Sequence, residues 1–147
     1  MAQTSATQVF PRRDAAGRVR SLAELVVASL LGTVVGLAAL ALIEGVLALL
    51  GLSTFGRASG WLAAILPGLL FFDDLRAWRG YGVRFLVALV GAAVAIGVGL
   101  IGAAGLGALP PMISGAAGAA LAVAVYSAVW FLGIRWLTGH RDEVESR

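Results

Sequence analysis

The chain has 147 residues, of which 60% are hydrophobic and 13% are charged, and it carries a net charge of +3 and no cysteine. Soluble domains are about 45–50% apolar, so this composition indicates a protein whose main solvent is lipid. The missing cysteines exclude disulfides, thiolate nucleophiles and Cys-based metal sites. The positive charge is spread over several loops without a basic helix, which excludes a nucleic-acid-binding surface of the usual kind.

Residues 1–20 form a polar segment that contains Pro11 and Gly17. We expect a flexible or surface-lying arm ahead of the first hydrophobic stretch. The arginines of this arm should attract anionic lipid headgroups, at about 1 kcal/mol per charge near the membrane surface. The predicted headgroup contacts are Arg12, Arg13, Arg18 and Arg20.

The first hydrophobic stretch covers residues 22–52 and has a recognisable start. Ser21 precedes it and Glu24 follows three positions later. This spacing predicts a capping box, in which each side chain accepts a hydrogen bond from the other residue's backbone amide. We therefore expect the first membrane-spanning helix to begin directly after Ser21.

A polar stripe runs along this first span. At about 100° per residue, Ser29, Thr33 and Glu44 fall within an arc of about 60°. An acidic residue inside a span is by default a functional candidate. Two interpretations stay open: proton or cation handling by the stripe, or a structural ion pair or hydrogen bond of Glu44. Arg57 and Ser114, both expected near the outer surface, are the candidate partners in the second case.

The second stretch covers residues 54–72 and is the shortest. Gly60–Phe72 alone is shorter than the roughly 20 residues that cross a hydrocarbon core, so a re-entrant hairpin is the alternative. If the stretch crosses, ten of the eleven arginines lie on one side and Arg57 lies alone on the other. If it does not cross, almost no charge bias remains, so we predict a span with a kink at Pro67.

Asp73 and Asp74 follow the second stretch, close to Arg76 and Arg79. Paired aspartates can hold a divalent cation, but this loop offers no further acidic residues at a regular spacing. We expect the two carboxylates to pair with the arginines or to cap the end of the second helix. His140 is the sole histidine and, without cysteine or a second histidine beside it, predicts no metal site.

The third and fourth stretches cover residues 85–109 and 112–137 and are joined through Pro110 and Pro111. Tandem prolines end one helix and can occupy the first turn of the next. Because the link is so short, we expect these two helices to be antiparallel neighbours. Tyr126, on the fourth stretch, is interpreted as a buried tyrosine that donates to a backbone carbonyl.

Small residues recur at every fourth position of three stretches, which is typical of close helix–helix contact in membranes. The predicted packing residues are Gly32 and Gly36 in the first stretch, Gly91, Ala95, Gly99 and Ala103 in the third, and Ala116, Ala120, Ala124 and Ala128 in the fourth. The fourth stretch has a second small face, Gly115, Ala119, Ala122 and Gly133. Two such faces predict either a compact bundle or lateral assembly with other subunits.

These patterns together predict an all-α bundle of four transmembrane helices over residues 21–138, with a short cytoplasmic tail at 139–147. Cytoplasmic loops retain arginine, so we expect both termini inside a cell membrane. The use of arginine at every basic position favours a prokaryotic, GC-rich source. We expect a non-catalytic protein without cofactors that acts through helix packing, as an accessory subunit or a structural membrane component. The alternative is a small oligomeric channel or proton-coupled transporter that uses Ser29, Thr33 and Glu44.

Overall fold

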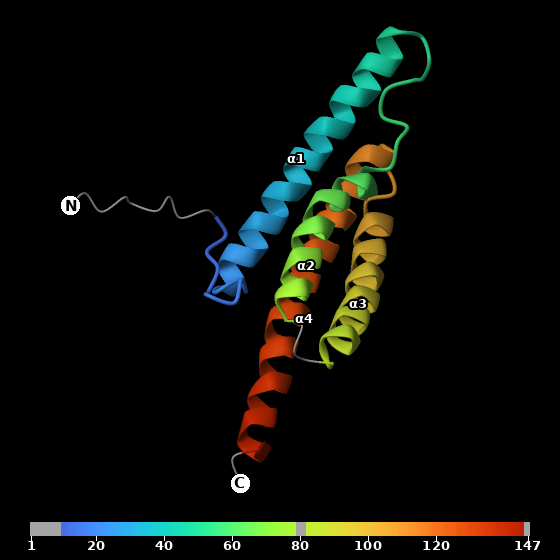
Figure 1. Ribbon diagram of the computed structural model, residues 1–147. Coiled ribbons are helices and arrows are strands. Elements are labelled where there is room, and N and C mark those ends of the chain that lie inside the picture. Colours follow the sequence, from blue (N-terminus) through green and yellow to red (C-terminus); the bar gives the residue numbers. More distant parts are fainter. Residues whose placement is uncertain (1–9, 79–81, 146–147) are drawn as a thin grey trace, which may run out of the picture.

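The computed structural model describes residues 10–78 and 82–145, with side chains up to residue 137 (Figure 1). Its elements are the helix α1 (Leu22–Leu49), the 3-10 helix η1 (Gly60–Ala64), and the helices α2 (Ile65–Ala77), α3 (Arg84–Gly105) and α4 (Pro111–Glu145). Within these residues the regular structure is helical, apart from an isolated antiparallel bridge between Arg13 and Val19. The all-α prediction is therefore confirmed.

Three helices are long and apolar enough to cross a membrane: Leu22–Leu49, Arg84–Gly105 and Pro111–Leu137. By length and composition, these helices are compatible with an integral membrane protein. Their positions agree with the first, third and fourth hydrophobic stretches of the sequence. The fourth helix, α2, has 13 residues and is preceded directly by the five-residue η1.

The second predicted span is shifted along the chain, because helical structure runs over residues 60–77 instead of 54–72. Residues 54–59 form a loop in which Gly56 has a φ of +86°, a left-handed conformation that interrupts a helix. The Ser59 side chain accepts a hydrogen bond from the amide of Trp61 and so starts η1. At the other end α2 continues through Asp73 and Asp74, which the sequence placed in a loop.

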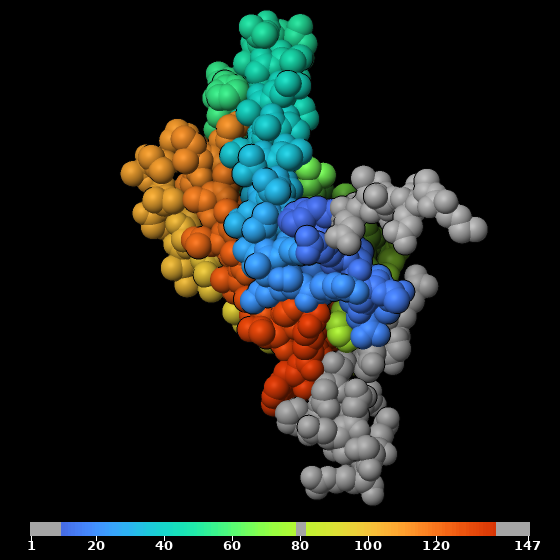
Figure 2. Space-filling view, turned by 90° about the vertical axis from the view of Figure 1, so that its left-hand side faces the viewer, coloured from blue at the N-terminus to red at the C-terminus, as the bar shows by residue number. Residues whose placement is uncertain are grey.

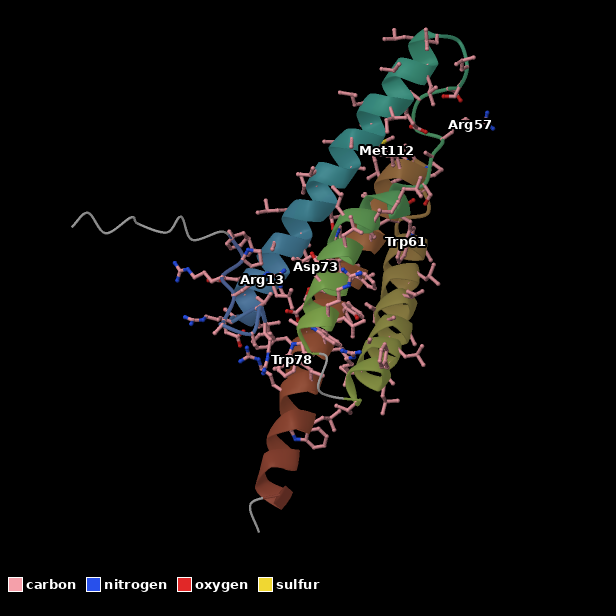
Figure 3. All side chains as sticks on the ribbon, viewed as in Figure 1. Arg13, Arg57, Trp61, Asp73, Trp78 and Met112 are labelled. Atoms are coloured by element: carbon pink, nitrogen blue, oxygen red, sulfur yellow. The ribbon has the colours of Figure 1, made fainter. Side chains whose placement is uncertain are left out.

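The chain runs up along α1, down through η1 and α2, up along α3 and down along α4 (Figure 1). α3 packs along α4, while α1 contacts α4, η1 and α2. The arm at residues 10–20 and the C-terminal half of α4 lie at the same end of this bundle, which we call the arm end (Figure 1). Arg13 lies at the arm end and Arg57 at the opposite end (Figure 3).

The C-terminal end of α1 projects beyond the N-terminal end of α4, and two perpendicular views agree on this (Figures 1 and 2). Its aliphatic side chains are open to the surroundings: Leu42 is 70% exposed and Leu49 is 89% exposed. Only Glu44 is buried in this part of the helix. The fully packed core lies instead at the arm end, where Leu25, Trp130 and Ile134 are at most 1% exposed.

Candidate functional site

Glu44 lies in the last turns of α1 and holds the loop that follows. Its two carboxylate oxygens accept hydrogen bonds from the backbone amides of Gly56, at 2.7 Å, and Ala58, at 2.5 Å. The residue is only 6% exposed. Of the two partners expected for Glu44, neither the Arg57 nor the Ser114 side chain takes this role; the backbone amides on either side of Arg57 do.

The other two members of the polar stripe are also buried, with Ser29 at 0% and Thr33 at 4% exposure. The Thr33 hydroxyl donates to the carbonyl of Ser29, one turn earlier in the same helix, at 3.0 Å. This is the usual way in which a helical threonine satisfies its hydroxyl. The Ser29 hydroxyl is buried and has no hydrogen-bond partner among the described residues. The stripe therefore faces the protein, as its periodicity predicted, but Ser29 and Thr33 are more than two turns from Glu44 along the helix.

The glycines of α3 let two backbones touch. A methyl group built on Gly99 would lie 2.6 Å from the carbonyl oxygen of Gly118, and one built on Gly118 would lie 2.7 Å from that of Gly99. Ala103 packs against Gly118 and Gly91 against Tyr126 in the same interface. The predicted stripe of α3 is thus used for contact with α4 inside one chain.

The small residues of α1 serve a different neighbour. A methyl group on Gly36 would lie 2.6 Å from the carbonyl oxygen of Ala63 in η1, and one on Gly32 would lie 3.3 Å from Cδ of Pro67. Gly60 packs in turn against the backbone of α4 at Ala116. η1 is therefore wedged between α1 and α4, where only glycine and alanine leave enough room.

The two small faces of α4 differ in burial. Gly115, Ala119 and Ala122 are buried, whereas Ala120 and Ala124 are only partly buried. The face that the periodicity ranked second is thus the more deeply packed one. In the more deeply packed face, Gly115 lies against Gly60 and Ala122 against Gly99, contacts that a compact bundle accounts for.

Asp74 is the centre of a polar cluster that the sequence did not predict. Its Oδ2 accepts a hydrogen bond from the indole nitrogen of Trp130 at 2.6 Å, and its Oδ1 accepts one from the amide of Val19 at 3.1 Å. The guanidinium of Arg13 lies 3.9 Å from the same Oδ1. Asp74 is 3% exposed. The expected pairing with Arg76 is wrong for this residue, and Arg79 lies outside the described residues.

The arm is a folded hairpin rather than an extended segment. Asp14 Oδ1 accepts hydrogen bonds from the amides of Ala16 and Arg18, both at 2.9 Å, and Gly17 turns the chain with a φ of +81°. This side chain-to-backbone pattern is typical of an Asx turn. The hairpin packs against the base of α1 and against α4 (Figure 2).

Two further side chains tie the hairpin to the bundle. The Glu24 carboxylate accepts a hydrogen bond from the amide of Arg12 at 2.8 Å, and Ser21 makes no side-chain cap. The predicted capping box is therefore wrong, since Glu24 is used by the arm. From α4, Arg135 donates to the carbonyls of Val19, at 3.0 Å, and Arg20, at 3.2 Å.

The four arm arginines differ in their contacts. Arg13 lies beside Asp74, and the Arg18 guanidinium lies 4.4 Å from the ring centre of Trp78, so both have partners within the protein. Arg12 lies 3.7 Å from the carboxylate of Glu24, and Arg12, Arg13 and Arg20 are exposed. Headgroup contact stays a prediction for all four.

Tyr126 belongs to an aromatic group between α2 and α4. Its ring lies edge-on to Phe71, with centroids 4.4 Å apart, and parallel to Trp130 at 6.4 Å. No group of three or more histidine, aspartate or glutamate side chains that could hold a metal ion occurs in the described part of the chain. His140 lies outside the described side chains.

Sequence reasoning missed Asp74, Trp130 and Arg135 as one unit, because they come from separate parts of the chain. The available signal in the sequence was an acidic residue directly after an apolar stretch. No model of a known protein family, no curated protein and no solved structure matches this chain.

Proposed function

We propose that this chain is a non-catalytic protein of the cell membrane that acts by binding another membrane protein, as an accessory subunit or structural component. The observation that carries the proposal is the C-terminal end of α1, which projects beyond the N-terminal end of α4 and exposes aliphatic side chains (Figure 1). Three glycines of the small-residue stripes, Gly36, Gly99 and Gly118, already contact backbone atoms of the same chain. Exposed aliphatic side chains occur on several helices, and those at the C-terminal end of α1 extend beyond the N-terminal end of α4 (Figure 1).

The length of α1 supports this interpretation. Its 28 residues make a helix of about 42 Å, against a hydrocarbon core of about 30 Å. To fit inside the core, α1 would need a tilt of about 45°, which is larger than the usual range of up to about 40°. Hydrophobic mismatch of this kind favours association with another helix. A partner that packs against Leu42 and Leu49 would cover these exposed side chains where α1 extends beyond the hydrocarbon core.

The distribution of arginine supports an orientation with the arm end in the cytoplasm. Arg76 lies in the last turn of α2 and Arg84 begins α3, so both belong to the arm end together with Arg13 and Arg135. Arg57 is at the other end (Figure 3). Cytoplasmic loops retain arginine, so we place both chain termini inside, with α2 completing the fourth crossing.

The first test is native purification in mild detergent followed by the intact mass of the particle. The absence of cysteine allows a photo-crosslinker to be attached at one chosen site, through Leu42→Cys on α1 or Leu89→Cys on α3. Both positions are at least 70% exposed, which makes them a matched pair. The proposal expects a stoichiometric partner protein that crosslinks from position 42 and not from position 89. A particle that contains only this chain and lipid, with no crosslink at position 42, would contradict it.

The alternative function, a channel or transporter, assigns a direct role in conduction to Glu44, whereas the accessory-subunit proposal assigns it a structural role. It requires a carboxylate that exchanges protons or ions, whereas two backbone amides occupy the oxygens of Glu44 and favour a structural role. A closed homo-oligomer whose proton or cation flux in liposomes is abolished by Glu44→Gln would replace the accessory-subunit proposal. Unchanged flux in that variant would rule out a conducting role for the stripe.

A further inference from the structure

An apolar cavity of about 410 Å³ lies between α2 and α3, with α4 as its floor. Trp61, Ala64, Gly68 and Phe71 line one wall and Ala92, Ala95 and Ile96 line the other. α2 makes its main helix contacts with α1, so its opposite side is left open along this cavity. In a membrane, such a cavity is accessible to the hydrocarbon chains of lipids.

A second cavity of about 230 Å³ adjoins the first at the arm end. Phe72 and Leu75 line both cavities, so the two follow one another along α2. The residues added in the second cavity are Arg76, Arg84 and Phe85. The combined groove is therefore apolar along most of its length and cationic at the end where α2 finishes and α3 begins.

The two arginines lack a counter-charge among the described residues. The Arg76 guanidinium lies 4.5 Å from the ring centre of Phe72, and that of Arg84 lies 4.6 Å from the ring centre of Phe85. Nε and Nη1 of Arg84 are buried, and no hydrogen-bond acceptor for them occurs among the described residues. A buried donor without a partner is costly, and more so when it is charged. Arg84 is thus positioned for an anion that the described part of the chain does not supply.

We propose that this groove binds one anionic phospholipid, with the phosphate between Arg76 and Arg84 and an acyl chain along the apolar cavity. Guanidinium groups form short, charge-assisted hydrogen bonds with phosphate oxygens. Basic pockets between helices at the cytoplasmic surface select anionic over zwitterionic headgroups. α3 begins at Arg84 without a side-chain cap, so the positive end of its dipole adds to the attraction. The site lies between α2 and α3 and is independent of the partner proposed for α1.

The headgroup is tested by native mass spectrometry of the full chain in mild detergent, with dioleoylphosphatidylglycerol, dioleoylphosphatidylethanolamine or inorganic phosphate added. We expect one phosphatidylglycerol to be retained and the zwitterionic lipid to be bound at least about tenfold more weakly. The double variant Arg76→Gln/Arg84→Gln should lose this preference. The single variant Arg84→Gln should weaken the preference, and its control Arg57→Gln, which removes the same charge from an exposed position outside both the groove and the arm, should keep it.

The acyl-chain cavity is tested by a matched pair of glycine substitutions. A methyl group built on Gly68 or on Gly97 meets nothing within 4 Å, so both tolerate a larger side chain, but only Gly68 lines the cavity. Gly68→Leu should lower phospholipid retention by about tenfold or more, whereas Gly97→Leu should leave it unchanged. Helix content and elution volume confirm that each variant is folded.

Three results would overturn the proposal. The first is equal retention of the two lipids by the unmodified chain, and the second is equal selectivity in the Arg84→Gln and Arg57→Gln variants. The third is displacement of phosphatidylglycerol by inorganic phosphate, which would make the site one for a soluble anion. None of these results bears on the protein partner of α1, because that partner is tested by crosslinking from position 42.

Discussion

Trp130 and Asp74 join α4 to α2 through a hydrogen bond of 2.6 Å between the indole nitrogen and a carboxylate oxygen, at a depth where both residues are at most 3% exposed. The same carboxylate holds the amide of Val19 and so fixes the arm to the two helices. A buried carboxylate with this set of donors stabilises three segments at once, and its removal leaves each donor without a partner.

The first prediction concerns this carboxylate. Asp74→Ala should lower the free energy of unfolding by about 3–5 kcal/mol, because it orphans the Trp130 and Val19 donors and removes the charge beside Arg13. Reversible unfolding of the purified protein in mixed micelles measures the change. The neighbouring Asp73→Ala, at an exposed position, is the control and should change stability by less than about 1 kcal/mol. Equal effects of the two substitutions would mean that the cluster does not stabilise the fold.

The second prediction compares the stability effects of substituting two glycines that lie about half a helical turn apart in α3. Gly99→Ala should destabilise the protein by about 1–3 kcal/mol, because its methyl group would crowd the Gly118 carbonyl and the ring of Trp61. Gly97→Ala meets nothing within 4 Å and should be neutral or stabilising by up to about 1 kcal/mol through helix propensity. The same unfolding assay compares them. A stable Gly99→Ala variant would show that α3 and α4 can separate without cost.

The helices themselves were largely predictable from the sequence. Long apolar runs marked α1, α3 and α4 to within a few residues at most ends, since only a helix satisfies its backbone in lipid. The small-residue periodicity also identified Gly99 and Gly36 as contact positions. It could not rank the two faces of α4, because glycine and alanine occur on both and the choice depends on where η1 packs.

The arm and the ends of α2 were not predictable for a physical reason. Asp74 remains in a helix because Val19, 55 residues away, and Trp130, 56 residues away, supply its hydrogen bonds. A local pattern carries no information about such partners. The capping box failed in the same way, since Glu24 had a competing donor in the amide of Arg12. Patterns such as the capping box predict a structure correctly when a residue's hydrogen-bond partners are its neighbours in sequence. Here the arm supplied distant partners to Asp74 and Glu24 instead.

The third prediction follows from the loop that Glu44 holds. Glu44→Gln replaces one acceptor oxygen by an amide group that cannot accept, so the hydrogen bonds to Gly56 and Ala58 cannot both be kept. Local opening of the loop should become easier by about 1–3 kcal/mol, which corresponds to about 5- to 150-fold faster hydrogen exchange at these two amides. The amide of Leu25, at the arm end of the same helix, should exchange at its original rate. Uniform acceleration along α1 would instead indicate global destabilisation.

The fourth prediction concerns the attachment of the arm by Arg135. Arg135→Gln weakens the charged donor that binds the carbonyls of Val19 and Arg20, so the hairpin should detach more often. Limited trypsin digestion reports this directly, because Arg12, Arg13, Arg18 and Arg20 are themselves cleavage sites. Cleavage tracks the population of the open form when opening and closing are fast, so a loss of about 1.4 kcal/mol gives about tenfold faster cutting.

The control for this experiment is Arg57→Gln, which removes one arginine from the opposite end of the bundle and leaves the hairpin contacts intact. If Arg135→Gln and Arg57→Gln leave arm cleavage equally slow, the Asp74 and Glu24 contacts suffice to hold the hairpin. Combining Arg135→Gln with Asp74→Asn then tests whether the two attachments act together. Because both hold the short segment around Val19, their effects should be coupled rather than additive. Coupled effects would show that the two attachments hold the arm as one cooperative unit.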